Sequence, residues 1–595
     1  MQTSTADSTG QGQLKFNDLT SNWLKNAPSF DSNGFNRDLV VWFCRDLLPF
    51  SAVGKCGFSG FMQKNLPDMS LPDRTTLSHA ALHDVYDAVK MKVTEDLKGA
   101  ETLCVMFDGW TDKYHRRHFL GIRVKIIRPD WSPVIITLSS NACEAQDAAG
   151  MVDHILRVMS KFLTDEELRN KTIFTTHDGA EAMKKASTLL HSQGFTHCLA
   201  HVLHLLIMVD SIKNVRDLMG LVKKSKNMVN KLHYKGCLLK EEAENEAETA
   251  ELESLLQMIE DAKMEQEAEE DVICLEDDVE HEKECETDDS DCAENAATSR
   301  GGKAPAFTTL KNEVETRWNS TFSMLESLTK QTKIVDKTLR RIGEPTLQKQ
   351  EWQVLTQVKD FLKNFQSLTE MVSGETAELS LIPLIKAEIK TVCQPDSKDC
   401  EELKTLKKNI LKNLDKRIPL TESVLQAALL DPAMKDLEIL SLDHTKKVKL
   451  LKDLHSSLPK ATQNSSTSSE EAADAGDLHQ STAAVPEANL NKRQKLLLKH
   501  SGTSSQQKLE HEIESYLATK ADPMLNPLEF WAQNNVSFPN VAQCARYLLS
   551  RNAASVPVEA LFSTMGLILN SRRSSLAPYR ANEIIFIHDN FDLYF

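Results

Sequence analysis

The chain has 595 residues, of which 41% are hydrophobic and 26% charged. This length and composition are typical of a globular protein with several domains and a large apolar core. No apolar run approaches the roughly 20 residues that span a bilayer, and the N-terminus lacks a signal-peptide core, so we expect no membrane association and an intracellular location. Twelve cysteines without a CxxC pair favour a reducing compartment.

The net charge of −16 is unevenly distributed along the chain. Residues 241–295 hold 25 Asp and Glu against two Lys, which leaves 61 acidic and 68 basic residues elsewhere, a balance of +7. A mildly basic body can bind nucleic acid in spite of the acidic total. We expect residues 241–303 to be a disordered, solvated tether that is dispensable for folding, and we hypothesise that it masks basic surface.

The N-terminal part of the chain predicts a small helical region. We expect residues 1–20 to be disordered and residues 21–100 to be helical, with one helix over 36–50 that ends at Pro49 and a long amphipathic helix over 77–97. No Cys/His quartet at zinc-finger spacing occurs here, so no zinc finger is expected.

A mixed α/β layer follows. The apolar run 103–107 ends at Asp108 and a glycine, which is typical of a buried strand. Further strands are predicted over 118–127, 134–140 and 172–176, with a helix over 148–163, and residues 195–209 are predicted as one buried helix. Asp178 comes directly after the fourth strand, so it and Asp108 are expected on one edge of the sheet.

The remainder predicts helices. Residues 211–240 and 308–455 favour helices, the second range with breaks near Pro345, Pro383 and Pro419, and residues 456–507 have the composition of a second disordered linker. Residues 509–595 predict three or four short helices with many large apolar side chains. They are too numerous for such helices to bury alone, so we predict that the segment packs on the sheet and on a second copy, with Trp531, Leu561, Phe562 and Ile585 as dimerisation residues.

Six short segments resemble signature blocks of the hAT superfamily of DNA transposases and the host proteins derived from them. They are DGWT at 108–111, DGA at 178–180 with Met183, CLAH at 198–201, EVETRWNST at 313–321, VEALFS at 558–563 with Gly566, and RRSSL at 572–576. Each block is weak alone, but all occur in the family's order. The resemblance implies an RNase H-like mixed sheet (101–210) interrupted by a large α-helical insertion (211–508) and completed by a C-terminal helical dimerisation segment (509–595).

The resemblance also implies a catalytic order Asp, Asp, Glu, which falls on Asp108, Asp178 and Glu559. Three carboxylates would hold two Mg²⁺ or Mn²⁺ ions that activate a water or a 3′-hydroxyl for phosphodiester cleavage. Nucleic-acid contacts are implied at Arg317, Trp318, Arg572 and Arg573. The sequence departs from the family at Ala182, where an asparagine is expected, and in the absence of the BED-type zinc finger.

Simpler interpretations stand beside these. Asp108 is also explained as a turn cap, and Glu559 as a carboxylate favoured in the first turn of a helix. Cys198 and His201 are interpreted as structural, with ion binding as the alternative, and Trp318 is either a core aromatic or a base-stacking platform. Three lysines at 223, 224 and 226 predict a solvated helix face first and a phosphate-binding patch second.

We therefore expect a domesticated, hAT-transposase-derived nuclear protein that associates with DNA or chromatin, regulates transcription and forms homodimers or larger oligomers. The basic cluster at 492–495 favours nuclear import. Two alternatives remain open: an active DDE-type transposase with metal-dependent strand transfer, and a dimeric interaction scaffold that does not bind nucleic acid. The missing finger argues against the enzyme and the three retained acids argue for it.

Overall fold

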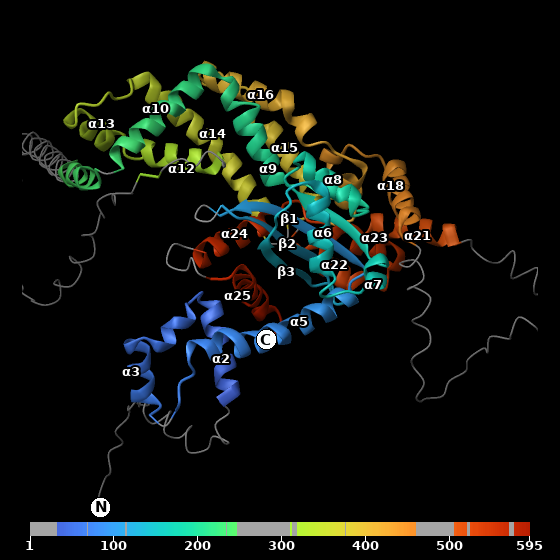
Figure 1. The fold of residues 1–595 in the computed structure, drawn as a ribbon. Helices are drawn as coiled ribbons and strands as arrows, with labels where there is room; N and C mark the ends of the chain where they lie inside the picture. Colours follow the sequence, from blue (N-terminus) through green and yellow to red (C-terminus); the bar gives the residue numbers. More distant parts are fainter. Residues whose placement is uncertain are drawn as a thin grey trace, which may run out of the picture. The chain divides into compact units, whose positions relative to one another are not determined.

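The computed structural model describes residues 32–67, 69–112, 116–233, 235–246, 310–311, 318–374, 377–459, 505–520, 524–569 and 576–595. They form two compact units (Figure 1). The sheet unit contains the described residues up to Cys198 and from Thr445 onward, and the helical unit contains those from Leu199 to His444. In the described part of the chain, no helix is long and apolar enough to cross a membrane.

The predicted disordered segments lie largely outside these residues. Residues 1–20 and 247–303 are not described, nor is most of 456–507. Where the predicted boundaries meet described residues, the prediction of disorder is wrong: residues 241–246 and 505–507 are helical.

The sheet unit is built on one mixed five-stranded sheet. Its strands lie in the order β3-β2-β1-β4-β5. The strands are β1 (Thr102–Thr111), β2 (His118–Ile127), β3 (Pro133–Ala142), β4 (Thr172–His177) and β5 (Gly194–His197). The pairs β1–β2 and β2–β3 are antiparallel, whereas β1–β4 and β4–β5 are parallel.

Four of the strands were predicted, and β5 was missed. Instead of one helix over 195–209, the structure has β5, then α9 (Leu199–His204) and a π-helical turn (Leu205–Val209). In β5 only Thr196 is buried, while Phe195 and His197 are exposed. A strand of four residues without an apolar face gives no alternating signal, so the apolar run that follows it dominated the prediction.

The C-terminal helix α25 (Pro578–Asn590) is joined to β3 by buried hydrogen bonds. The register of β2 and β3 shifts between Ile122 and Arg123, so Thr137 lies beside a bulge. The Asn590 side chain accepts from the Thr137 N–H at 3.0 Å and donates to its carbonyl at 2.8 Å. The side chain of Asn582 accepts from the Ser140 N–H at 2.7 Å. Asparagine amides thus satisfy backbone groups along the edge strand.

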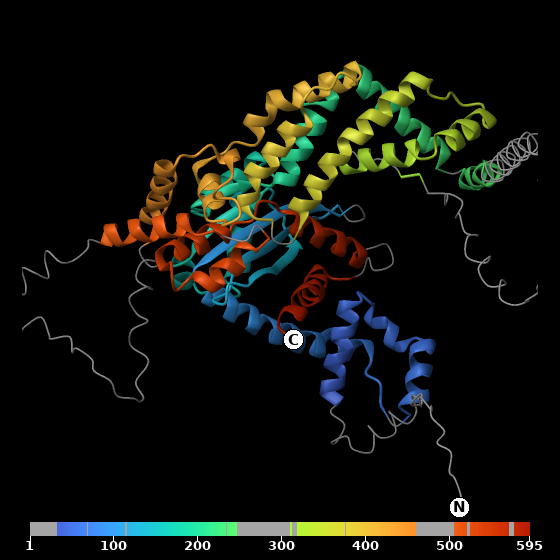
Figure 2. The same ribbon diagram turned by 180° about the vertical axis from the view of Figure 1, so that it is seen from behind.

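The other helices of the sheet unit surround this sheet. They are α2 (Ser32–Arg45), α3 (Cys56–Asn65), α4 (Arg74–Thr76), α5 (Leu82–Gly99), α6 (Ala148–Met159), α7 (Asp165–Arg169), α8 (Glu181–Leu189), α18 (His444–Ser457), α21 (Ser505–Ala518), α22 (Pro527–Asn534), α23 (Pro539–Leu549) and α24 (Val556–Ile568). Helices α2 and α5 pack on α25, and α6 packs on α8. Both views of the ribbon show the red C-terminal helices against the blue strands (Figures 1 and 2).

The helical unit contains no strand among its described residues. Its helices are α9, α10 (Arg216–Leu232), α12 (Trp318–Thr329), α13 (Thr332–Arg341), α14 (Lys349–Ser373), α15 (Ile382–Val392), α16 (Glu401–Arg417) and α17 (Glu422–Leu429). The predicted breaks are confirmed: Pro345 lies between α13 and α14, Pro383 is in the first turn of α15, and Pro419 follows the end of α16. Proline lacks the N–H of a helix interior but suits a first turn.

Candidate functional site

Asp108 lies where the buried part of β1 ends. The five residues before it are fully buried, whereas Asp108 is half-buried and Gly109 is exposed. The apolar run fixes the strand within the core, because each of its side chains is removed from water on one face or the other. The first carboxylate of the predicted site is therefore positioned by burial of the residues before it.

Asp178 follows the neighbouring parallel strand in the same register. Leu103 pairs with Ile173, and Met106 with Thr176, so each partner lies 70 positions further on. Asp108 and Asp178 differ by the same 70 positions and stand two residues beyond the last pair. Adjacent strands are about 4.8 Å apart, so the two aspartates lie side by side just beyond the last β1–β4 pair. The prediction that Asp108 ends its strand is wrong, because β1 continues to Thr111 and pairs Asp108 with Gly121 of β2.

Cys104, Met106 and Asp108 belong to one face of the sheet, because side chains alternate along a strand. The Cys104 Sγ lies 3.5 Å from the Thr176 Oγ1. Thr176, two residues before Asp178, belongs to this face as well, whereas Asp178 itself lies one residue beyond the end of β4.

The segment 551–555 covers this face and binds three of its strands. Asn552, fully buried, donates its backbone N–H to the Cys104 Sγ at 3.4 Å and accepts the Thr176 hydroxyl at 2.8 Å. Its side chain donates to the Ala554 carbonyl at 2.7 Å. Ser555 donates its N–H to the Cys198 Sγ, just after β5, at 3.2 Å. These buried bonds place the chain above the ends of β1, β4 and β5 immediately before α24 begins.

Arg551 extends this contact to the edge of the sheet. Its side chain is buried, donates to the Thr196 hydroxyl at 3.0 Å, and lies with its guanidinium 4.7 Å from the centre of the Phe174 ring. Burial lowers the pKa of this arginine. The sequence analysis missed Arg551 and Asn552. The available signal was a run of polar residues, RNAAS, between two strongly apolar helices.

Helix α24 carries Glu559 over the strand pair that contains Asp108. Asp108 is paired with Gly121 of β2. A Cβ added to Gly121 would lie 2.8 Å from the Val558 Cγ1, so only a glycine allows α24 to approach this closely. The ring of Phe562 stacks on that of Trp110, with centres 5.9 Å apart. Glu559, half-buried in the first turn, therefore lies on the helix that covers the face of Asp108.

The three carboxylates provide oxygen donors, which Mg²⁺ and Mn²⁺ prefer. Each aspartate is also engaged by its own loop: Asp108 accepts the Gly109 N–H at 2.7 Å, and Asp178 accepts the Ala180 N–H at 2.8 Å. Across the described residues, no group of three or more His, Cys, Asp or Glu side chains stands in position to hold a metal ion. Metal ligation by Asp108, Asp178 and Glu559 stays a prediction.

His177 stabilises the turn that carries Asp178. Its Nδ1 accepts the Gly179 N–H at 3.0 Å, and burial, together with the nearby His197, lowers its pKa to about 4. The ring is therefore neutral at neutral pH, as an accepting Nδ1 requires. Gly179 has a φ of 90°, and a Cβ there would lie 2.4 Å from the His197 Nδ1, so the turn needs a glycine.

The residues of the predicted CxxH block have local structural contacts. Cys198 is fully buried and accepts the Ser555 N–H described above. His201 is half-buried on α9, with its ring centre 6.1 Å from that of His204. The His204 Nδ1 accepts the N–H of Trp318 at 3.1 Å, and burial lowers its pKa to about 4. A neutral His204 thus fixes the start of α12.

Of the predicted nucleic-acid residues, only Trp318 lies within the part of the chain that the structure describes. Trp318 is 2% exposed and its ring centre lies 6.4 Å from that of Phe322, so it is a core aromatic, and a buried ring offers no face for stacking on a base. This corrects its assignment as a nucleic-acid residue. Arg317, Arg572 and Arg573 lie outside the described residues.

The predicted dimerisation side chains are buried inside the chain. Trp531, Leu561 and Ile585 are inaccessible, and Phe562 is 7% exposed. The prediction that this segment packs on the sheet is confirmed, because α24 and α25 contact its strands. Packing of these four side chains on a second copy is not supported, because they are already buried within the chain. Among the described residues of this segment, the exposed large apolar ones are different: Met524, Val536, Leu567, Tyr579, Leu593 and Phe595.

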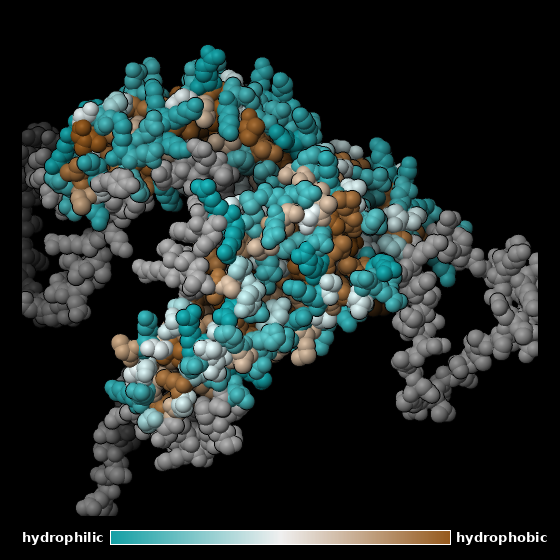
Figure 3. Space-filling model, in the orientation of Figure 1, coloured by the Kyte–Doolittle hydropathy of each residue, from teal (hydrophilic) through white to brown (hydrophobic). Residues whose placement is uncertain are grey.

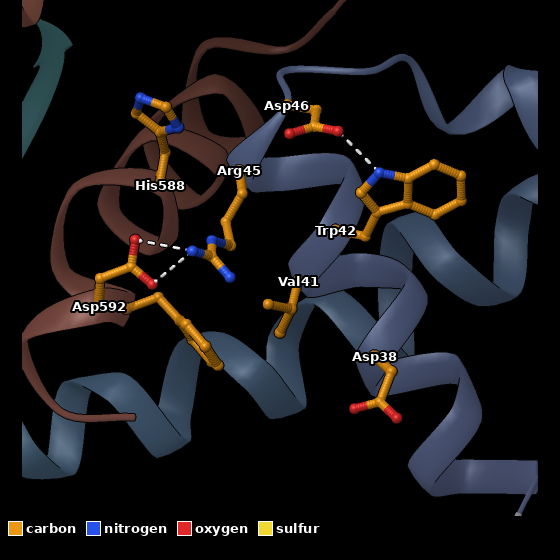
Figure 4. Close-up of a pocket in the computed structure, with 8 residues that line it drawn as sticks. Asp38, Val41, Trp42, Arg45, Asp46, His588 and Asp592 are labelled. Carbon is orange, nitrogen blue, oxygen red and sulfur yellow. Dashed lines mark hydrogen bonds and ion pairs between the residues drawn. The ribbon is translucent and has the colours of Figure 1, made fainter. Parts of the chain in front are cut away.

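A separate cavity of about 610 Å³ lies between α2 and the end of α25 (Figure 4). It is lined by Asp38, Val41, Trp42, Arg45, Asp46, His588, Phe591 and Asp592. Its polar groups pair with one another: the Trp42 indole donates to Asp46 at 2.7 Å and Arg45 pairs with Asp592 at 3.0 Å. No predicted site residue lines it.

Comparison with known proteins agrees with this geometry. Residues 512–591 match the hAT family C-terminal dimerisation region. The Transposable element Hobo transposase of Drosophila melanogaster is 24% identical over 397 residues, which cover 63% of this chain and 49% of that protein. Human Zinc finger BED domain-containing protein 4 is 21% identical over 569 residues, 92% of this chain and 42% of that protein. The chain spans less than half the length of either relative.

The chain is thus similar to hAT transposases: its C-terminal region matches that family's dimerisation region, and most of its length aligns with a transposase and with a zinc finger BED protein.

Proposed function

We propose that this chain is a domesticated, nuclear DNA- and chromatin-associated regulator of transcription, built on an RNase H-like core and self-associating through its C-terminal region. The observation that carries the proposal is the docking of α24, with Glu559, over Asp108 and its partner Gly121, beside Asp178. This arrangement supports an inherited catalytic position. The match of residues 512–591 to a dimerisation region supports self-association.

In this proposal Asp108, Asp178 and Glu559 would hold Mg²⁺ or Mn²⁺, and the bound ions would supply charge neutralisation at a DNA phosphate. The chain's own contribution is positional. Buried strands position the residues before the two aspartates, and the bonds of Asn552 tie the segment before α24 to β1 and β4 before any ligand arrives.

An active transposase is the second candidate, favoured by the same three acids. The two candidates differ in cleavage and not in fold. Incubation with supercoiled DNA and Mn²⁺ separates them: the regulator leaves the plasmid intact, whereas the transposase nicks it in a reaction that Asp178→Asn abolishes. A scaffold without nucleic-acid function is the third candidate, and it predicts no binding to hairpin or linear DNA at any salt concentration.

Metal binding is tested without activity, by thermal unfolding of the full chain. An ion that binds only the folded state stabilises it by about 2.7 kcal/mol at 100 times its dissociation constant. We expect Mg²⁺ or Mn²⁺ to raise the melting temperature and Asp108→Asn to remove most of that rise. The matched control is Asp130→Asn, in an exposed turn after β2, which should keep it. A rise that persists in Asp108→Asn contradicts the ligand assignment.

Self-association is tested by sedimentation at micromolar concentration. We expect a dimer or a larger assembly. Because the buried anchors cannot face a partner in this fold, Val536→Glu and Leu567→Glu, at exposed positions, should weaken association, whereas Met91→Glu, exposed on α5, should not. A strict monomer contradicts this part of the proposal.

A further inference from the structure

Helix α13 of the helical unit has two distinct faces. Val335 and Leu339 are fully buried, whereas the opposite side carries exposed Lys333, Lys337 and Arg341. Their spacing of four residues places these cations in one stripe along the helix. Residues 330–341 contain five Lys or Arg against one Asp, so the face is strongly basic. Figure 3 shows a mostly hydrophilic surface over the helical unit as a whole, with smaller apolar areas.

The cations of this stripe are paired with the first residues of the acidic stretch. Glu246 pairs with Lys337 and lies 3.5 Å from Lys333. Arg341 bridges Glu241 at 3.2 Å and Glu242 at 3.1 Å. Residues 236–246 are helical and lie beside α13 (Figure 1). The acidic stretch therefore begins as a helix that covers the basic face with carboxylates.

These pairs shift the ionisation of both partners. The hydrogen bond from Lys337 lowers the pKa of Glu246, and the bonds to Glu241 and Glu242 raise the pKa of Arg341. The cations stay exposed, with Lys333 at 82% and Arg341 at 44%, whereas Glu246 and Glu242 are partly buried at 24% and 15%. Solvent reaches the cation of each pair and screens the attraction. Exposed pairs of this kind contribute little to stability and exchange readily with other ions.

The surrounding sequence is unusual for a purely structural contact. Residues 211–240 hold eight Lys or Arg against one Asp, and on α10 the cations Lys224 and Lys231 pair with Glu351 and Glu344. Beyond residue 246 the stretch continues to be acidic: 25 Asp and Glu against two Lys over 241–295. The helical unit thus combines basic helices with an acidic stretch, and this stretch continues in sequence from the short helix that pairs with α13.

We propose that the basic face of α13 is a binding surface for the phosphate backbone of duplex DNA, and that Glu241, Glu242 and Glu246 occupy it as an internal competitor. The carboxylates stand where phosphates would bind, so DNA must displace them. The surface lies in the helical unit and does not involve the strand-end acids. It extends the proposed DNA association, yet its test does not depend on the wild-type chain binding DNA.

The dimensions of the stripe suit this ligand. Lys333 and Arg341 are eight residues apart, a helix rise of about 12 Å. One DNA strand presents a phosphate about every 3.4 Å along its axis, so the stripe spans about three to four phosphates. Three freed cations would neutralise about three of them, and each contributes about 0.9 to the slope of log affinity against log salt.

The test is binding of a fluorescein-labelled 20-base-pair duplex to the full chain between 50 and 200 mM salt. We expect the triple variant Glu241→Gln/Glu242→Gln/Glu246→Gln to have a slope steeper than wild type by about 2.7, and thus an additional loss of about 40-fold across this range. At 50 mM salt its dissociation constant should be at least about tenfold lower than that of wild type. Adding Lys333→Gln, Lys337→Gln and Arg341→Gln to this variant should return both the salt slope and the dissociation constant to about the wild-type values.

The matched control neutralises three acids elsewhere on the helical unit: Glu388→Gln, Glu401→Gln and Glu402→Gln. This control changes the net charge by the same amount. If it gains as much affinity for DNA as the first triple variant, the gain comes from net charge alone and the proposal is overturned. An unchanged dissociation constant in the first triple variant, or a gain that survives the loss of the α13 cations, overturns it too. If wild type binds DNA and the variants match it, the proposed function stands and this inference fails.

Discussion

The segment 551–555 on the sheet and the acid-covered face of α13 hold their polar groups in opposite ways. At the sheet, Asn552 and Arg551 are buried, and their partners on β1, β4 and β5 lie more than 350 positions away in the sequence. At α13, the partners are exposed ion pairs. Burial removes the competition of water, so the sheet contacts fix geometry, whereas exposed pairs exchange with solvent ions. The buried segment therefore fixes the position of α24 on the sheet, whereas the ion pairs on α13 can exchange their partners.

The strongest way to break this contrast is to separate α24 from the sheet. Gly121→Val should destabilise the sheet unit by about 1–3 kcal/mol, at the upper end of that range, because its Cβ would lie 2.8 Å from Val558. Gly109→Ala on β1 is the matched control, since nothing lies within 4 Å of its added Cβ. Urea unfolding measures both. Equal midpoints for the two variants contradict the close packing of α24.

Asn552→Ala should have the next largest effect. It leaves the Ala554 carbonyl without its donor in a fully buried site, at a cost of about 1–3 kcal/mol. Asn364→Ala, at an exposed position of α14, should change stability by less than about 0.5 kcal/mol. The same unfolding experiment compares them, and a similar effect for both would show that the bonds of Asn552 do not hold the segment.

The stability of the helical unit should depend on pH, with an effect smaller than those of Gly121→Val and Asn552→Ala. Burial lowers the pKa of His204 to about 4, below the 6.5 of an unperturbed histidine. Between these values the unfolded chain binds the proton and the folded chain does not, so stability is full above pH 6.5 and falls as the pH decreases toward 4. His204→Asn, which keeps an acceptor for Trp318, should flatten this decrease, whereas His191→Asn, at an exposed position, should not. Unfolding midpoints at pH 7.5, 6 and 5 measure it.

The smallest stability effect is expected at α13. Neutralising Glu241, Glu242 and Glu246 together should change the unfolding free energy by less than about 1 kcal/mol, because each pair is exposed. A large loss of stability would show that the ion pairs on α13 hold the fold together, as the buried bonds of segment 551–555 do. Calorimetry of the same variant that is used for DNA binding provides the measurement.

Local pattern predicted much of the candidate site. The buried run before Asp108 predicted β1, and the short run before Asp178 predicted β4. Their parallel pairing brings Asp108 and Asp178 side by side, although β1 continues past Asp108 to Thr111. Glu559 was assigned only through resemblance, because nothing near it in the sequence shows that its helix returns to β1. The same limit explains Trp318, whose burial depends on how α12 packs, and β5, whose exposed side chains leave no periodic signal.

The sequence by itself determined the strands with strong apolar runs, the helix breaks at prolines and the segregation of charge, because these follow from side chains close together along the chain. Only the tertiary structure decided which distant segments meet. Gly121 has no sequence signal for the approach of Val558, and a polar run gives no sign that Asn552 will lie on Cys104 and Thr176. The acidic stretch likewise shows its charge in sequence, but its pairing with α13 depends on the fold, since attraction between charges requires proximity.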